Sequence, residues 1–160
     1  AGEGFKHYFK NCFIEGSTDF IFGEASALFE DCILHSKSNS YITAASTPKN
    51  QKFGFVFKNC KLTADDNVTE VFLGRPWRNY AKTVFINCEM GKHIKPEGWH
   101  NWGNLEAEKT SFYAEYKNYG EGFNSEKRVF WSHQLKKTQT KKYTIENILK
   151  SDTKWYLNIK

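Results

Sequence analysis

Methionine, proline and long apolar runs are scarce in this sequence. Its 160 residues include one Met and three Pro. No apolar run approaches the roughly 18 residues that a membrane-spanning helix needs, so we expect no contact with a membrane. The residues after Ala1 do not form a charged, apolar and small-residue secretion signal. Helix-turn-helix patterns, aromatic RNA-binding signatures and zinc-ligand spacings are also missing, so nucleic acid is not an expected partner.

Aromatic residues are abundant instead. They make up 17% of the chain, with 14 Phe, 8 Tyr and 5 Trp. Together with Val, Ile and Thr, and with Asn, Gly and Asp at the turns between strands, they favour β-structure. The net charge of +5 fits ordinary solubility, but it would also steer a polyanion, either nucleic acid or an acidic polysaccharide, toward the protein. Four late lysines, which we interpret first as solvated surface, contribute to it: Lys136, Lys137, Lys141 and Lys142.

The four cysteines mark an internal repeat. Each lies in the pattern Phe-x-(Asn/Asp)-Cys-x-(Ile/Leu/Met), at intervals of 20, 28 and 28 residues. A repeat of this length is typical of a solenoid rather than of a metal site or a disulfide framework. The four copies are Phe9–Ile14, Phe29–Leu34, Phe57–Leu62 and Phe85–Met90.

The spacing within each copy predicts a turn followed by a short strand. Asn and Asp tolerate the left-handed backbone of a turn, and the Cys and the aliphatic residue two positions later face the same side of a strand. Stacking such strands about 4.8 Å apart builds an all-β, parallel β-helix. Stacked thiols could oxidise, but buried free thiols are the preferred interpretation.

The predicted organisation is one domain over residues 1–160. We expect β-helix coils over about 1–104 and C-terminal loops with a short helix over 105–160, the best helix candidate being 141–150. A helical solenoid is the alternative, but no amphipathic stretch before residue 105 exceeds a turn or two.

Two short segments are not required by the repeat. In Gly16-Ser-Thr-Asp-Phe-Ile-Phe-Gly23, Asp19 lies between a turn and an apolar strand. Taken alone, it would be interpreted as a solvated loop residue.

The second segment is Leu73-Gly-Arg-Pro-Trp77. We expect Gly74 to permit an unusual backbone angle and Pro76 to fix the next one, so that Arg75 is rigidly presented beside a flat aromatic ring. A surface turn whose Arg packs on a ring is the ordinary alternative.

Together, the two segments resemble the nucleophile and arginine motifs of pectin methylesterases. The resemblance implies a right-handed parallel β-helix, here the C-terminal part of the catalytic domain. It further implies a hydrolase that removes methyl esters from pectin, in cell wall modification or pectin catabolism, with no cofactor and no metal. The likeness continues in order through Tyr41–Ala44, Gly98–Trp102, Phe112–Gly120 and Lys127–Trp131.

The resemblance also implies roles for individual residues. Asp19 is expected to attack the ester carbonyl carbon, release methanol and form an acyl-enzyme that water hydrolyses. Arg75 is expected to bind and orient the Asp19 carboxylate. Trp77 would stack on the sugar, Phe22 would form a second wall of the cleft, and Thr18 is a further substrate-binding candidate.

One family motif is missing. In pectin methylesterases a Gln-Asp-Thr motif shortly before the nucleophile supplies the general acid and base, and Gln side chains stabilise the oxyanion. Here 18 residues precede Asp19 and none is Asp or Gln. We expect a fragment cut after this motif, because a solenoid terminus normally carries a polar cap. Such a fragment would expose inward side chains and be poorly soluble.

Three alternatives to an active esterase stay open. The first is a natural relative that has lost catalysis and only binds pectin. The second is a carbohydrate-binding β-helix without catalysis. A pectate lyase-like enzyme would often need calcium, but Asp65-Asp66 and Glu106-Ala-Glu108 are too scattered for a calcium cage. For the esterase, the expected partner is methyl-esterified polygalacturonate. The full-length enzyme is expected to be monomeric and secreted or periplasmic, because pectin lies outside cells.

Overall fold

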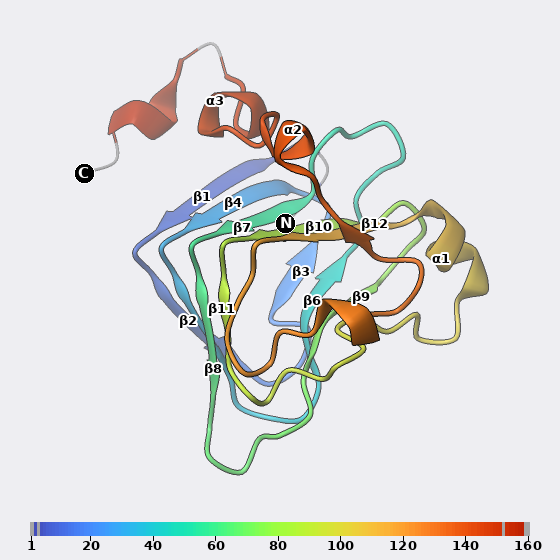
Figure 1. Ribbon diagram of the computed structural model, residues 1–160. Helices are drawn as coiled ribbons and strands as arrows, with labels where there is room; N and C mark the ends of the chain where they lie inside the picture. Colours follow the sequence, from blue (N-terminus) through green and yellow to red (C-terminus); the bar gives the residue numbers. More distant parts are fainter. Residues whose placement is uncertain (1, 3, 152, 159–160) are drawn as a thin grey trace.

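The chain folds as a parallel β-helix (Figure 1). The structure is a computed structural model that describes residues 2, 4–151 and 153–158. Strands from successive coils pair in parallel and in register, so that β1, β4, β7 and β10 lie side by side. The all-β, parallel fold that the cysteine repeat predicts is confirmed.

Three sheets form the sides of the β-helix. The six-stranded sheet, in the order β1-β4-β7-β10-β12-β13, contains Lys6–Lys10, Ser26–Glu30, Phe55–Lys58, Lys82–Ile86, Phe112–Tyr116 and His133–Gln134. The four-stranded sheet, β2-β5-β8-β11, contains Phe13–Gly16, Ile33–Ser36, Lys61–Ala64 and Glu89–Met90. The three-stranded sheet, β3-β6-β9, contains Ile21–Gly23, Tyr41–Ala45 and Phe72–Pro76.

The repeated Asn or Asp forms the corner between the first two strands of each coil. All four adopt the left-handed backbone that the sequence predicts, with φ of 54°: Asn11, Asp31, Asn59 and Asn87. The following Cys lies at the corner, one residue before the strand begins. The prediction of a Cys inside the strand is therefore wrong by one residue, because the bend takes two residues rather than one.

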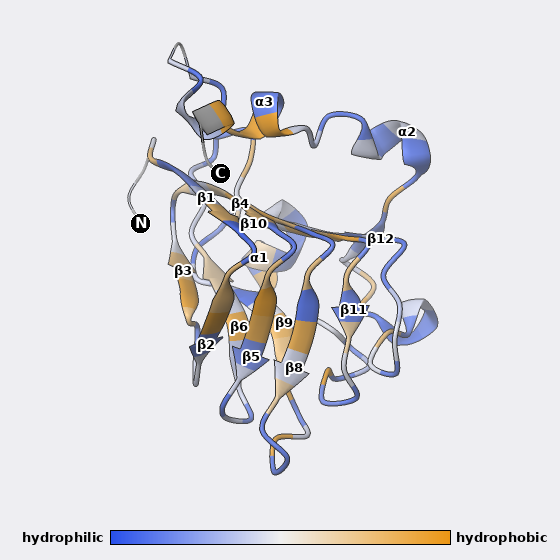
Figure 2. Cartoon of the chain, turned by 90° about the vertical axis from the view of Figure 1, so that its left-hand side faces the viewer, coloured by the Kyte–Doolittle hydropathy of each residue, from blue (hydrophilic) through white to orange (hydrophobic). Residues whose placement is uncertain are grey.

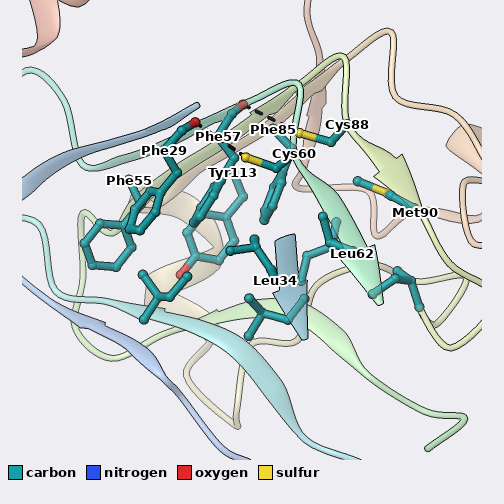
Figure 3. Close-up of a cluster of buried hydrophobic side chains, with 14 of the residues drawn as sticks. Phe29, Leu34, Phe55, Phe57, Cys60, Leu62, Phe85, Cys88, Met90 and Tyr113 are labelled. Carbon is teal, nitrogen blue, oxygen red and sulfur yellow. Dashed lines mark hydrogen bonds between the residues drawn. The ribbon is translucent and has the colours of Figure 1, made fainter. Parts of the chain in front are cut away.

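Aromatic rings and thiols stack along the axis (Figure 3). The rings of Phe29, Phe57 and Phe85 follow one another with centroids 4.6 and 4.3 Å apart. The cysteine thiols are free, as predicted, and those of Cys32, Cys60 and Cys88 donate to carbonyl groups of the preceding coil. The distance from Sγ to oxygen is 3.5 Å from Cys60 to Phe29 and 3.7 Å from Cys88 to Phe57. Equivalent side chains of successive coils thus build the core.

The coils continue past residue 104, where the sequence predicts loops. β12 pairs with β10 so that Tyr116 lies beside Ile86, and the chain turns again at Lys117, which has φ of 49°. Asn118 takes the position of the repeat Cys, and its Oδ1 accepts a hydrogen bond from the Cys88 N–H at 2.9 Å. Because this coil replaces Asn-Cys by Lys-Asn, the sequence motif does not reveal it.

Short C-terminal helices cover part of the six-stranded sheet, and two other short helices lie between strands. Of the predicted helix over 141–150, only Ile145–Ile148 is helical, because the helix begins where the Thr144 side chain caps it by accepting a hydrogen bond from the Asn147 N–H. Both α2 and α3 lie over the outer face of the sheet (Figures 1 and 2), where Ile148 and Leu149 are buried. No described helix is long and apolar enough to cross a membrane. The helices are α1 (Leu105–Thr110), η1 (Ser125–Lys127), α2 (Lys137–Thr140), α3 (Ile145–Ile148) and η2 (Trp155–Asn158).

Inward side chains of the first coil border an open hollow. It has a volume of about 320 Å³ and lies at the β1, β2 and β3 end of the β-helix. Its apolar lining includes Phe9, Ile14, Phe20 and Phe29. Core side chains are therefore accessible at this end.

Candidate active site

Asp19 occupies the corner between β2 and β3. Its backbone is left-handed, with φ of 50°, and its N–H donates to the Tyr41 carbonyl at 2.8 Å. Among residues with a side chain, Asn and Asp adopt this conformation most readily. Gly16 allows the tight corner, because a Cβ there would lie 2.3 Å from the Cβ of Phe20. The turn thus fixes the position from which the Asp19 carboxylate projects.

Strand β9 presents Arg75 on the three-stranded sheet. The in-register neighbour of Arg75 is Ala44 of β6, whose other neighbour is Phe22 of β3. These three side chains therefore share one face of the sheet. Gly74 lacks the unusual backbone angle that the sequence predicts, since its φ is not positive. Glycine is needed there for close packing instead, because a Cβ would lie 2.0 Å from Oγ1 of Thr43.

Asp19 and Arg75 form a two-point ion pair. Nε of Arg75 donates to Oδ1 at 3.1 Å, and Nη2 donates to Oδ2 at 2.5 Å. The Arg75 side chain is 6% exposed and the Asp19 side chain 14%, so the carboxylate alone keeps some access to solvent. A planar guanidinium that binds both oxygens holds a carboxylate in one orientation. The contact predicted from the two motifs is present.

Aromatic rings surround the guanidinium group. Its Cζ lies 4.0 Å from the ring centroid of Trp102, 4.9 Å from that of Trp77 and 5.3 Å from that of Tyr41. Cation–π contacts of this kind stabilise a charge that has left bulk water. Trp102 was not predicted as a site residue, although it lies in the Gly98–Trp102 segment that resembles the family.

Three adjacent aromatic side chains are open to solvent above the ion pair. Phe22 is 46% exposed, Trp77 43% and Trp102 58%. The ring of Phe22 meets that of Trp77 edge-on with centroids 5.1 Å apart, and Trp77 lies nearly parallel to Trp102 at 6.3 Å. Thr18 is exposed, and within the described chain no hydrogen bond ties its side chain to this cluster. The structure thus gathers Phe22 and Trp77 as predicted, adds Trp102, and leaves Thr18 at the side.

A hydrogen-bond chain positions the loop that carries Trp102. Burial raises the pKa of Tyr41, so its hydroxyl group is neutral at physiological pH. Its Oη lies 3.1 Å from Nδ1 of His100, and the same Nδ1 accepts a hydrogen bond from the Trp102 N–H at 3.2 Å. Tyr41 therefore contacts Arg75 through its ring and supports Trp102 through its hydroxyl group.

Each of the two acidic clusters, Asp65-Asp66 and Glu106-Ala-Glu108, contains a carboxylate with a local partner. Oδ1 of Asp65 lies 2.8 Å from Nε2 of His35, and the carboxylate of Glu106 accepts from Lys109 at 2.7 Å. Among residues 2, 4–151 and 153–158, no group of three His, Cys, Asp or Glu side chains is placed to hold a metal ion.

The Pectinesterase family model matches residues 3–152. The chain belongs to the pectinesterase family. It is 50% identical over 132 residues to Putative pectinesterase 11 of Arabidopsis thaliana, which covers 81% of this chain and 37% of that protein. It is 44% identical over 131 residues to Pectinesterase 31 of the same plant, with coverage of 81% and 41%. This pectinesterase chain thus spans less than half the length of these curated relatives.

Solved structures agree with this assignment. A pectin methylesterase from carrot superposes with a TM-score of 0.88 at 29% identity, covering 97% of this chain and 53% of the carrot chain. A pectin methylesterase in complex with a hexasaccharide superposes with a TM-score of 0.76 at 31% identity, covering 91% and 52%. These neighbours are right-handed parallel β-helices, which is the fold predicted for this pectinesterase.

Proposed function

We propose that this pectinesterase removes methyl esters from pectin with Asp19 as the nucleophile. The observation that carries the proposal is the two-point ion pair between Asp19 and Arg75, set beneath three exposed aromatic rings. A nucleophilic carboxylate must be kept charged and aimed, and a fixed guanidinium does both. Each partner comes from one of the two family motifs, which supports assigning this pair to the chemical step.

The reaction would proceed through an acyl-enzyme. One carboxylate oxygen of Asp19 forms a bond to the carbonyl carbon of a methyl galacturonate, and the bond from that carbon to the methoxy group breaks. Methoxide takes a proton and leaves as methanol. Water then hydrolyses the mixed anhydride, which frees the galacturonate carboxylate and restores Asp19. Arg75 can hold the second carboxylate oxygen throughout, because its fork spans both oxygens.

The exposed aromatic rings supply a surface for the sugar. Phe22 and Trp77 meet edge-on, so one ring can lie under a sugar while the other stands at its side. Trp102 extends the flat surface next to Trp77. Aromatic faces offer large apolar area at low entropic cost, which suits the carbon face of a pyranose. Thr18, exposed beside Asp19, stays a candidate for a hydrogen bond to the sugar.

Turnover needs two further contributions. A proton donor for methoxide and hydrogen-bond donors for the oxyanion are each worth about 100-fold or more in rate. By family resemblance both come from the Gln-Asp-Thr region, which the 160-residue sequence does not contain. The proposal therefore assigns to these residues the nucleophile, its arginine partner and the sugar-stacking surface.

Methanol release from methylated pectin tests the proposal. The protein is produced together with any residues that precede Ala1 in its gene, and Asp19→Asn is compared with the unmodified protein. We expect kcat to fall by about 1000-fold or more, while pectin binding is retained. Asp65→Asn is the matched control, since Asp65 is a half-exposed carboxylate bound to His35 away from the site. Unchanged turnover in Asp19→Asn would remove Asp19 from the nucleophile role.

The same assay separates the alternatives. A protein that binds methylated pectin and releases no methanol would favour the non-catalytic pectin-binding β-helix. Unsaturated products, followed by their ultraviolet absorbance, would instead indicate a lyase.

The proposed substrate also sets an expectation for location and assembly. Because pectin lies outside cells, we propose that the full-length protein is secreted or periplasmic and acts as a monomer. Cell fractionation and light scattering of the full-length protein would test the two statements separately.

A further inference from the structure

A second pocket is lined by none of the residues assigned above to the proposed active site. It is formed by the end of the loop before β7, the start of β10 and the C-terminal segment, and has a volume of about 220 Å³. We propose that it binds the carboxylate group of a uronate unit, such as an unesterified stretch of galacturonan. Three lysines and three aromatic residues line the pocket: Lys52, Lys82, Lys142, Phe53, Phe112 and Tyr143.

The aromatic rings hold two of the ammonium groups at the pocket. Nζ of Lys142 lies 5.3 Å from the ring centroid of Phe112 and 5.1 Å from that of Tyr143. Nζ of Lys52 lies 5.2 Å from the ring centroid of Phe53. Phe53 and Tyr143 meet edge-on with centroids 5.7 Å apart, so both lysines belong to one cluster of rings.

Lys82 brings a third positive charge into the same pocket. Lys82 is the first residue of β10 and is partly buried, and its Nζ donates to the carbonyl oxygen of Gln51. Burial, followed by the nearby charge of Lys142, lowers the pKa of Lys82. The ammonium groups of Lys82 and Lys142 therefore lie close enough in the pocket to repel each other.

Acidic side chains do not balance these charges. The pocket lining contains no Asp or Glu, and no described carboxylate forms an ion pair with any of the three lysines. A pocket lined by one sign of charge and by low-dielectric walls concentrates the electric field. An anion in the pocket would therefore relieve repulsion that the protein alone leaves in place.

The chemistry of the lining favours a carboxylated sugar. Ammonium groups act as point charges and need no planar fork on the ligand. The partly exposed ring of Phe112 offers apolar surface for a pyranose face, with the buried Tyr143 behind it. The volume is below the roughly 300 Å³ of sites for drug-sized ligands, so it suits one sugar unit. That this sugar is galacturonate rests on the proposed function, which produces galacturonate carboxylates.

One loop joins this pocket to the proposed active site. Ser46 lines a groove together with Phe22 and Trp77, and Lys52, six residues later, lines the lysine pocket. This loop, between β6 and β7, is teal in Figure 1 and rises beside α2. A polymer that crosses the loop would contact both places, so de-esterified units could stay bound next to the site that produced them.

Binding of oligosaccharides tests the proposal. Unesterified oligogalacturonate, the same oligomer fully methyl-esterified, and inorganic phosphate are each titrated into the protein. Calorimetry gives the affinity, and amide shifts of Lys82 and Tyr143 report this pocket while those of Trp77 report the active site. We expect Lys52→Gln/Lys82→Gln/Lys142→Gln to weaken binding of the unesterified oligomer by about tenfold, since exposed ion pairs contribute a few-fold each.

The matched control removes the same number of positive charges from the C-terminal segment that carries Lys142. Lys136→Gln/Lys137→Gln/Lys141→Gln should change the affinity by less than about twofold, because these lysines lie outside the pocket. If the Lys82 change prevents folding, Lys52→Gln/Lys142→Gln alters only exposed side chains and replaces the triple variant.

Three results would overturn the proposal. Equal losses in both triple variants would mean that net charge alone attracts the polymer. Binding of phosphate or of the esterified oligomer as tight as that of the unesterified one would exclude uronate recognition. Shifts at Trp77 without shifts at Lys82 or Tyr143 would place the ligand elsewhere. None of these measurements depends on methanol release, so they fail or succeed independently of the proposed esterase activity.

Discussion

The buried ion pair between Glu115 and Arg128 lies at the C-terminal end of the core, and its contribution to stability can be measured. Glu115 takes the position after Phe85 in the stack of core rings, since the two residues are in-register neighbours in β12 and β10. Arg128 donates from Nε to its Oε2 at 2.8 Å and from Nη2 to its Oε1 at 3.2 Å. The side chains are 0% and 2% exposed. Arg128 also donates to the Pro96 carbonyl at 2.9 Å.

We expect Glu115→Ala to be strongly destabilising. It leaves the Arg128 charge buried without a counter-charge, and removing one partner of a buried pair costs about 3–5 kcal/mol. For a chain of this size, each kcal/mol lowers Tm by roughly 2–4 °C, so a fall of about 6–20 °C follows. Thermal and urea unfolding, followed by circular dichroism, give both quantities. Glu89→Ala is the control, because its pair with Lys61 is 40% and 52% exposed and is worth at most about 1 kcal/mol.

A double variant separates charge from packing. Glu115→Leu combined with Arg128→Met removes both charges and keeps most of the volume, and such replacements are often neutral or stabilising. We therefore expect it to be more stable than Glu115→Ala. The reasoning would be refuted if Glu115→Ala cost no more than Glu89→Ala, or if the double variant were as unstable as Glu115→Ala.

Three further predictions concern the site, the pH dependence and the corners. Arg75→Lys should lower kcat for methanol release by about tenfold or more and leave KM nearly unchanged, because one ammonium group cannot bind both oxygens of Asp19; equal kcat would contradict this. Burial lowers the pKa of His93 to about 4. Between pH 4 and 6.5 the unfolded state therefore binds more protons than the folded state. The free energy of unfolding should fall by about 3 kcal/mol as the pH drops through that range. Urea unfolding at several pH values should show this slope in the native protein and lose it in His93→Gln. Asn59→Ala should lower the free energy of unfolding by roughly 1 kcal/mol, because residue 59 has a positive φ. Asn59→Gly should leave it nearly unchanged, since glycine adopts this backbone readily. Equal losses of stability in the two variants would argue against backbone strain.

Local sequence patterns predicted the fold and part of the site. The Asn-Cys pairs carry the left-handed corners in their own chemistry, and the regular recurrence of Phe and Cys requires stacking. Asp19 and Arg75 were recognisable because each lies in a short specific motif. The extra coil at Asn118 was missed since a Lys replaces the corner Asn there, and the role of Gly74 was misread because close packing, rather than dihedral freedom, demands glycine at that position.

What the sequence by itself determined is a stacked, parallel β-structure and the identity of the two charged residues. Only the tertiary structure decided that Trp102 covers the contact between Asp19 and Arg75, and that three distant lysines share a pocket. The physical reason is the parallel register. Alternation along a strand sets which side chains share a face, but contacts between faces, corners and covering loops depend on how successive coils align in space.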